Sequence, residues 1–164
     1  MAREKPPVTP AIRLLRHNRV EFTPHLYAYA ERGGTEVSAR ELGVDEHRMI
    51  KTLIMEDNAG GPLIVLMHGD RQVSTKELAR ILGVKSVAPC APAVADRHSG
   101  YQVGGTSPFA TRRQMPVYME KSIGELPRIF VNGGKRGFLV EIAPADLIRI
   151  LQPSFVNVAI RQDQ

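Results

Sequence analysis

The most informative single residue is Lys51. It lies in Met49–Glu56, an apolar, β-favouring run, and strand alternation places it on one face with Leu53 and Met55. Because burying an unpaired ammonium costs several kcal/mol, this lysine needs a partner. Two interpretations stay open: the side chain binds a ligand phosphate or a reacting group, or it reaches water or an internal carboxylate at the end of the strand.

A glycine-rich segment is the second feature with chemical potential. Gly104 and Gly105 allow the backbone to approach a ligand closely, and their N–H groups can converge on one oxygen, as stabilising an oxyanion requires. Thr106 and Ser107 add short hydroxyl groups, and Pro108 stiffens the exit. Taken alone, the same five residues are also typical of an ordinary turn.

The segment Asn132–Gly137 is glycine-rich and basic. Its N–H groups and the cations Lys135 and Arg136 could hold a phosphate. The spacing is not that of a P-loop, so the exposed tip of a hairpin is the alternative.

The remaining nucleophile and metal-ligand candidates are weak. Cys90 has no base near it in the sequence and fits a small buried apolar residue better than a catalytic one. The histidines, at positions 17, 25, 47, 68 and 98, show no metal-ligand spacing. We therefore expect neither a metal nor another cofactor.

Composition favours one globular domain with an anionic partner. The chain has 164 residues, of which 43% are hydrophobic, and its formal charge is +5 with a pI of about 9.7. The single cysteine excludes an internal disulfide, and no run approaches a membrane span or an export signal. The expected location is the cytoplasm, without a membrane partner.

Local signals predict the elements that position these residues. Thr9 followed by Pro10 predicts the start of a helix that runs to about Arg16. Capping boxes at Ser38 and Ser74 predict two short helices that end before Gly43 and Gly83, and a last helix is expected over 144–151. An extended segment is expected over 21–29, a hairpin over 49–56 and 63–68, and further strands over 116–119, 128–132 and 138–142.

Several joins between strands are too short for parallel crossovers. This favours an α+β fold: a single domain with a mixed, largely antiparallel curved sheet flanked by short helices. We expect the domain to span 9–158, between an N-terminal tail (1–8) and a C-terminal tail (159–164).

These motifs occur together in an order that resembles one family closely, the YbaK family of free-standing aminoacyl-tRNA editing proteins, which is related to the editing domain of prolyl-tRNA synthetase. The resemblance covers about Thr9 to Val158. It is carried by four segments in the family's order: Thr9–Leu15, Lys51–Leu53, Gly100–Phe109 and Gly133–Gly137.

The resemblance implies cleavage of the ester that joins a wrong amino acid to the 3′ end of tRNA, most typically in Cys-tRNA(Pro), with Cys-tRNA(Cys) as a second substrate. In the cysteine-specific branch, the substrate's own thiol attacks its carbonyl. The implied partners are the acceptor end of aminoacyl-tRNA and prolyl-tRNA synthetase, and not DNA.

The family's motifs also map residue by residue. The family's lysine corresponds to Lys51, its tyrosine to Tyr27, and its glycine-rich loop to the segment from Gly104 to Pro108. We expect the catalytic group to comprise Lys51, Gly105, Thr106 and Ser107. The expected substrate-binding residues are Tyr27, Gly104, Pro108, Gly134, Lys135 and Arg136, with Arg112 and Arg113 helping to hold the acceptor stem.

One position departs from the family pattern. Where some members have an aspartate, this chain has Leu139, so an acid role there is not carried over. Two alternatives therefore remain: a deacylase for another small amino acid such as alanine, in which water attacks, and a module that binds tRNA or a synthetase without turnover. The preferred tRNA and the oligomeric state are not encoded in any motif.

Overall fold

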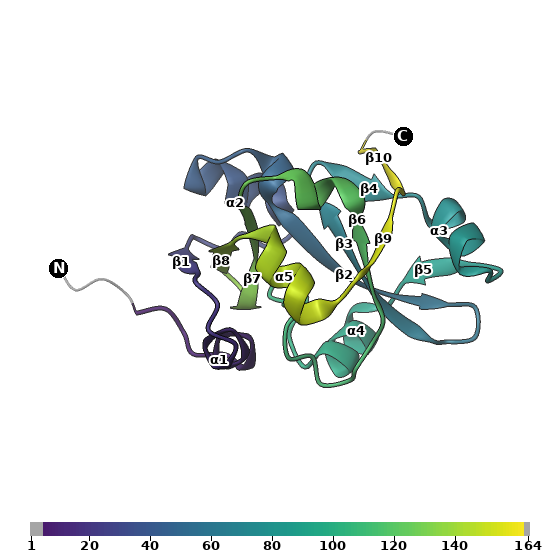
Figure 1. The fold of residues 1–164 in the computed structure, drawn as a ribbon, viewed down its shortest axis with the longest axis horizontal. Coiled ribbons are helices and arrows are strands. Elements are labelled where there is room, and N and C mark those ends of the chain that lie inside the picture. The colour runs from purple at the N-terminus through teal and green to yellow at the C-terminus, as the bar shows by residue number, and fades with distance from the viewer. Residues whose placement is uncertain (1–4, 163–164) are drawn as a thin grey trace.

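The expected hairpin forms the centre of the fold (Figure 1). In the computed structural model, which describes residues 5–162, β2 (Ile50–Asp57) pairs antiparallel with β3 (Pro62–His68). Every residue of β3 is buried. A strand with both faces covered needs no polar alternation, which explains its continuous apolar run.

The hairpin extends into a mixed five-stranded sheet in the order β5-β2-β3-β6-β9. Its added strands are β5 (Val87–Pro89), β6 (Val117–Glu120) and β9 (Ser154–Val156). β6 runs parallel to both β3 and β9, whereas the other pairings in this sheet are antiparallel. The predicted α+β class with a mixed sheet is confirmed.

A three-stranded antiparallel sheet, β1-β8-β7, stands beside the start of β2. It consists of β1 (Thr23–Leu26), β7 (Ile129–Lys135) and β8 (Phe138–Ile142). A bridge between Met49 and Phe130 links it to the larger sheet. Because β5 pairs only with the far end of β2, and the amide of Cys90 donates to the carbonyl of Ile54, residues 50–53 of β2 lie at an open edge between the two sheets.

The C-terminal boundary predicted from the sequence is wrong. β10 (Ala159–Arg161) pairs antiparallel with β4 (Arg71–Val73), so residues 159–161 belong to the folded domain. Hydrogen bonds to the buried carboxylate of Glu120 from the amides of Val158 and Ala159, at 2.7 and 2.9 Å, fix this segment. At the other end, residues 5–8 have no regular structure, and the rest of the predicted N-terminal tail lies outside the described residues.

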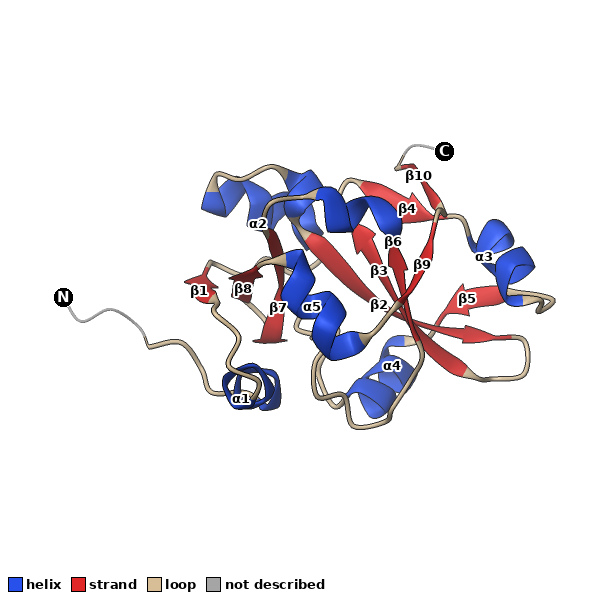
Figure 2. Ribbon diagram, in the orientation of Figure 1, coloured by secondary structure: helices blue, strands red, loops and turns tan. Residues whose placement is uncertain are grey.

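The helices cover the sheets from several sides (Figure 2). They are α1 (Pro10–His17), α2 (Gly34–Leu42), α3 (Thr75–Leu82), α4 (Pro92–Ser99) and α5 (Pro144–Leu151), with 3-10 turns over Glu46–Arg48 and Lys121–Glu125. Two predicted caps are present: the Thr9 hydroxyl accepts from the amide of Ile12, and the Ser74 hydroxyl accepts from that of Glu77.

Two helix predictions need correction. α2 begins at Gly34, so Ser38 lies inside it and donates to the carbonyl of Thr35 in place of capping an end. α4 was not expected from the sequence at all. Within residues 5–162, no helix has the length and hydropathy that a membrane span requires.

Candidate active site

A cleft of about 680 Å³ opens along the free edge of β2. This volume lies in the usual range for small-ligand sites. Its walls come from the segment after β1, from α2, β2, α4 and β7, and from the glycine-rich loop. The predicted site residues that line it are Tyr27, Lys51, Gly104, Thr106 and Arg136.

Lys51 is half-buried, and its ammonium donates to the carbonyl oxygen of Arg71. Among residues 5–162 it has no carboxylate within 4.0 Å, although Glu46 and Asp70 are near enough to attract it. Burial lowers the pKa of Lys51, and the two carboxylates oppose that shift. Among residues 5–162 that carbonyl is the acceptor the ammonium has, so two of its three protons are available to a ligand.

The glycine-rich loop differs from the expected arrangement in one decisive detail. The amide of Gly105 donates to the carbonyl of Gln102 at 2.7 Å, so it is not free to stabilise an oxyanion. The amides of Gly104 and Thr106 have no acceptor among residues 5–162, and both residues line the cleft. The amides of Gly104 and Thr106 are therefore better placed than that of Gly105 for the donor role predicted from the sequence.

Three side chains hold the glycine-rich loop in place. Asp96 accepts from the amide of Val103 at 2.9 Å, and Asn132 donates to the carbonyl of Gly104 at 3.2 Å. Arg136 donates to the carbonyl of Val103 at 3.0 Å. Asp96 and Asn132 also line the cleft and were not assigned a role from the sequence. Asp96 was missed together with α4, although proline at the first position of that helix and glycine after its end are a recognisable signal.

Ser107 and Pro108 do not contact the cleft. Ser107 is fully buried, and its hydroxyl accepts from the amide of Phe109 at 3.1 Å. The hydroxyl of Tyr101, whose pKa burial raises to about 12, donates to the carbonyl of Phe109 at 2.7 Å and not to Ser107. Pro108 is buried beside Ser107. Both residues therefore belong to the buried side of the loop, and they do not make the substrate contacts expected from the sequence.

We predict that Ser107→Ala weakens the fold and not the chemistry. Leaving the Phe109 amide without its acceptor should cost about 1–3 kcal/mol of unfolding free energy. Denaturant unfolding measures this cost, and ester cleavage by the folded variant should stay within about twofold of the parent, since that change is under 0.5 kcal/mol. An unchanged stability with a large loss of turnover would restore Ser107 to the site.

Tyr27 and Tyr29 also line the cleft, and the Tyr29 ring lies against the glycine-rich loop, with its hydroxyl 2.6 Å from the position of a Cβ atom on Gly104. Tyr27 is half-buried, and desolvation raises its pKa, so its phenol remains a hydrogen-bond donor at neutral pH. The Arg136 guanidinium lies 5.1 Å from the centre of the Tyr29 ring. Leu139 also lines the cleft and packs in an apolar cluster with Met49 and Phe130, so no acid stands at that position.

Next to the cleft, the fold brings together two of the histidines. The rings of His47 and His68 stack at 3.7 Å with an angle of 6°. His47 bonds to Asp70 at 2.8 Å, and both ring nitrogens of His68 have partners, the carbonyl of His47 and the hydroxyl of Ser122. Possible metal-ligand atoms of His47, His68 and Asp70 lie within 4.8 Å of one another. The two rings are nearly parallel, however, so their nitrogens do not point toward one common position. The group is therefore better suited to a structural role than to metal binding.

His68 is expected to make stability depend on pH. Burial lowers the pKa of His68 in the folded chain, so the unfolded chain takes up the proton first when the pH falls. Stability should therefore fall on acidification from about pH 6.5, the ordinary histidine value. Thermal unfolding across that pH range checks this. The loss of stability at acidic pH should be smaller in His68→Gln. It should be unchanged in His17→Gln, which replaces an exposed residue of α1.

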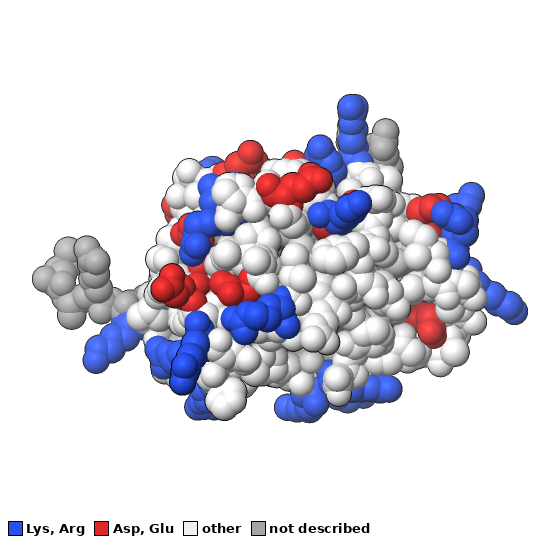
Figure 3. Space-filling model, viewed as in Figure 1, with Lys and Arg blue, Asp and Glu red and all other residues white. Residues whose placement is uncertain are grey.

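Positive side chains lie in and near the cleft: Arg32, Lys51 and Arg136 line it, together with the carboxylates of Glu31 and Asp96. On the face in Figure 3, Lys and Arg side chains lie around α1 and below α4. Arg112, Arg113 and Lys135 are exposed, and none is in an ion pair among residues 5–162. This distribution suits a polyanionic partner whose binding weakens with salt.

Comparisons with known proteins identify the family of this chain. The aminoacyl-tRNA editing domain family matches residues 31–150. A protein of Enterococcus faecalis, EbsC, described as a candidate Cys-tRNA(Pro)/Cys-tRNA(Cys) deacylase, is 28% identical over 155 residues, 94% of each chain. Proline–tRNA ligase of Thermodesulfovibrio yellowstonii is 45% identical over 47 residues, which are 29% of this chain and 8% of the ligase.

The fold also occurs in solved structures. A candidate trans-editing enzyme for prolyl-tRNA synthetase has a TM-score of 0.79 at 16% identity, with 93% of this chain and 98% of that chain covered. The hypothetical protein APE2540 has a TM-score of 0.84 at 22% identity, over 93% and 100% of the two chains. Since the family match covers more than half of the sequence, this chain belongs to the aminoacyl-tRNA editing domain family.

Proposed function

We propose that this protein is a trans-editing deacylase that clears mischarged Cys-tRNA(Pro), with Cys-tRNA(Cys) as a second substrate. The main support is one cleft lined both by a half-buried lysine and by the two loop residues whose amides have no acceptor among residues 5–162, in a chain of the editing family. The similarity to EbsC, described as a candidate deacylase for these two tRNAs, supports the choice of amino acid.

The cleft suits chemistry that requires no protein nucleophile. An aminoacyl ester is already activated, so holding it and stabilising charge on its carbonyl oxygen supplies much of the acceleration. One well-placed donor contributes roughly 10²–10³ in rate. We assign the amides of Gly104 and Thr106 to the carbonyl oxygen, and Lys51 to the terminal phosphate or ribose.

In this mechanism, the substrate's thiol sulfur forms a bond to its own carbonyl carbon. The ester bond to the ribose oxygen breaks, and the thiol proton ends on the ribose hydroxyl, which leaves a cyclic thiolactone. Tyr27 would orient the aminoacyl group by donating a hydrogen bond. Positioning converts this step into an intramolecular reaction with a high effective molarity.

Cys90 lines the cleft, yet it is not expected to react. Burial, together with the nearby Glu56 carboxylate, raises the pKa of its thiol and keeps it protonated. Cys90→Ser should therefore retain turnover within about threefold, a difference under 1 kcal/mol in barrier height. Single-turnover rates measure this, and a folded Cys90→Ser variant without activity would identify the protein's own sulfur as the nucleophile.

A panel of charged tRNAs tests the proposal. Purified protein is incubated with tRNA(Pro) charged with cysteine, alanine or serine, and loss of each ester is compared with its spontaneous rate. Thiol attack predicts that cysteine is released and serine is spared, because the serine hydroxyl is a weaker nucleophile. A second tRNA, tRNA(Cys), tests whether the protein or a partner such as prolyl-tRNA synthetase selects the tRNA.

The same panel also tests the two alternative functions. Release of alanine with cysteine spared would indicate water as the nucleophile and a different editing substrate. Binding of tRNA without any release would indicate the non-catalytic module, consistent with Leu139 at the position of the family's acid.

A further inference from the structure

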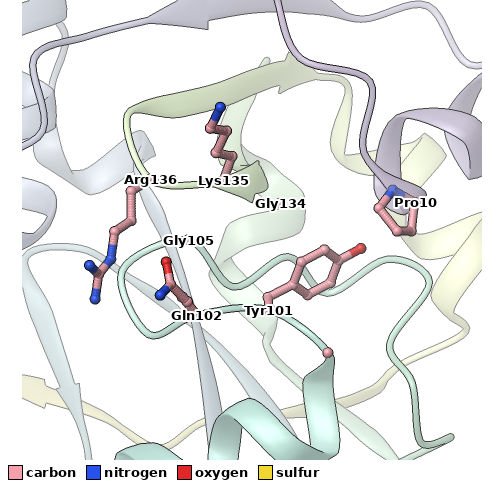
Figure 4. A pocket seen from close by; sticks show the side chains of 8 residues that line it. Pro10, Tyr101, Gln102, Gly105, Gly134, Lys135 and Arg136 are labelled. Carbon is pink, nitrogen blue, oxygen red and sulfur yellow. The ribbon is translucent and has the colours of Figure 1, made fainter.

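A second cavity lies behind the glycine-rich loop and has a volume of about 420 Å³. Figure 4 shows the backbone of Gly105 and Gly134 at its centre, with Pro10 and Tyr101 on one side and Gln102 and Arg136 on the other. Gly100 and Lys135 complete its lining. Of these residues, Arg136 alone also lines the larger cleft.

The glycine-rich loop and the β7–β8 turn, which both border this cavity, are in close backbone contact. A Cβ atom on Gly105 would lie 2.6 Å from the amide nitrogen of Arg136 and 2.8 Å from the carbonyl carbon of Lys135. Gly105 therefore allows the loop to touch the β7–β8 turn. Arg136 borders both spaces, so the two cavities meet at this residue.

The electrostatics of the small cavity favour an anion. Neither Lys135 nor Arg136 has a carboxylate within 4.0 Å among residues 5–162, and the Arg112 side chain packs 3.3 Å from the Cβ position of Gly100. Arg136 uses its Nε atom to hold Val103, so its two terminal nitrogens remain available as donors. Planar guanidinium donors match the geometry of a phosphate.

We propose that this small cavity binds the nucleotide that precedes the terminal adenosine of tRNA, with the phosphate joining the two nucleosides at Arg136 and Lys135 at the rim. This inference rests on the proposed function, which places the aminoacyl-adenosine in the larger cleft. The lining of glycine backbone, Pro10 and Tyr101 offers a flat, weakly specific surface for a ribose and base. Lys135 and Gln102 border only the small cavity, so they can be changed without altering the lining of the larger cleft.

Binding of non-cleavable analogues tests this proposal without turnover. The probes are adenosine carrying a 3′-amide-linked cysteine, and the dinucleotide CpA carrying the same group. We expect the dinucleotide to bind about tenfold more tightly, as one charge-assisted contact supplies. Lys135→Gln should remove most of this gain, and Gln102→Trp should remove it by filling the cavity. Lys76→Gln, an exposed lysine of α3, should retain it.

Salt dependence provides a second readout. Lys135→Gln should lose one contact to the phosphate of the dinucleotide. For a single strand, this loss should reduce the slope of log Kd against log salt concentration by about 0.7. The slope for the adenosine probe should not change. Equal affinity of the parent protein for both probes, or a tenfold gain that persists in Lys135→Gln and Gln102→Trp, would overturn the proposal. Failure of the deacylase function would show separately, as intact charged tRNA in the panel.

Discussion

Lys51→Ala is expected to reduce ester cleavage by at least about 100-fold, the size of effect that loss of one electrostatic contact at a reacting centre produces. The fold should survive, because the substitution removes a charge from a half-buried site and leaves only the Arg71 carbonyl without a donor. Single-turnover cleavage and thermal unfolding are measured on the same sample. Lys76→Ala, an exposed lysine on α3, is the control and should retain full activity.

The ionisation of Lys51 adds a pH signature to this result. Because burial lowers the pKa of Lys51, binding of the non-cleavable adenosine probe should weaken as the pH rises, before 10.5 is reached. Lys51→Arg keeps its charge throughout, so its binding should not show this loss. If Lys51→Ala cleaves at the parental rate, or if the parent and Lys51→Arg share one pH profile, the lysine has a structural role only.

Gly105→Ala is expected to have the second large effect. Its methyl group would lie 2.6 Å from the backbone nitrogen of Arg136, so the loop must move away from the β7–β8 turn. Displacing the amides of Gly104 and Thr106 by about 1 Å should cost about 100-fold in rate. The measurement is single-turnover cleavage, with folding checked by circular dichroism.

A second glycine provides the matched control for this variant. A Cβ atom on Gly124 would meet its nearest neighbour at 3.8 Å, and its backbone is not in the left-handed region. Gly124→Ala should therefore cleave normally. Full activity of folded Gly105→Ala would show that the contact between the loop and the turn does not position the reacting groups.

The parts of the fold that are encoded locally could be predicted from the sequence. Thr9 and Ser74 cap helices through bonds to residues three positions away, and the apolar runs of β2 and β3 are separated by a short glycine turn. The capping pattern at Ser38 was misleading because the residues before it, from Thr35, already belong to the helix. A cap pattern specifies a helix end only where the preceding residues do not extend it.

The residues that form the site were easier to predict from the sequence than the way they are arranged. Lys51 and the glycine-rich loop were identified by residue type, and the fold brings both to one cleft. The bond from the Gly105 amide to Gln102 and the close approach to Arg136 depend on the conformation of two loops, which residue types do not specify. The same holds for the stacking of His47 on His68, which follows from strand pairing and not from spacing.

In the proposed function, one cleft lined by Lys51 and by two loop residues whose amides have no acceptor among residues 5–162 cleaves the ester of a mischarged tRNA. The most direct measurement is the rate at which labelled cysteine leaves Cys-tRNA(Pro) under single-turnover conditions with excess protein. We predict rapid release with the parent protein and release at the spontaneous rate with Lys51→Ala. Release at the spontaneous rate with the parent protein itself would contradict the account.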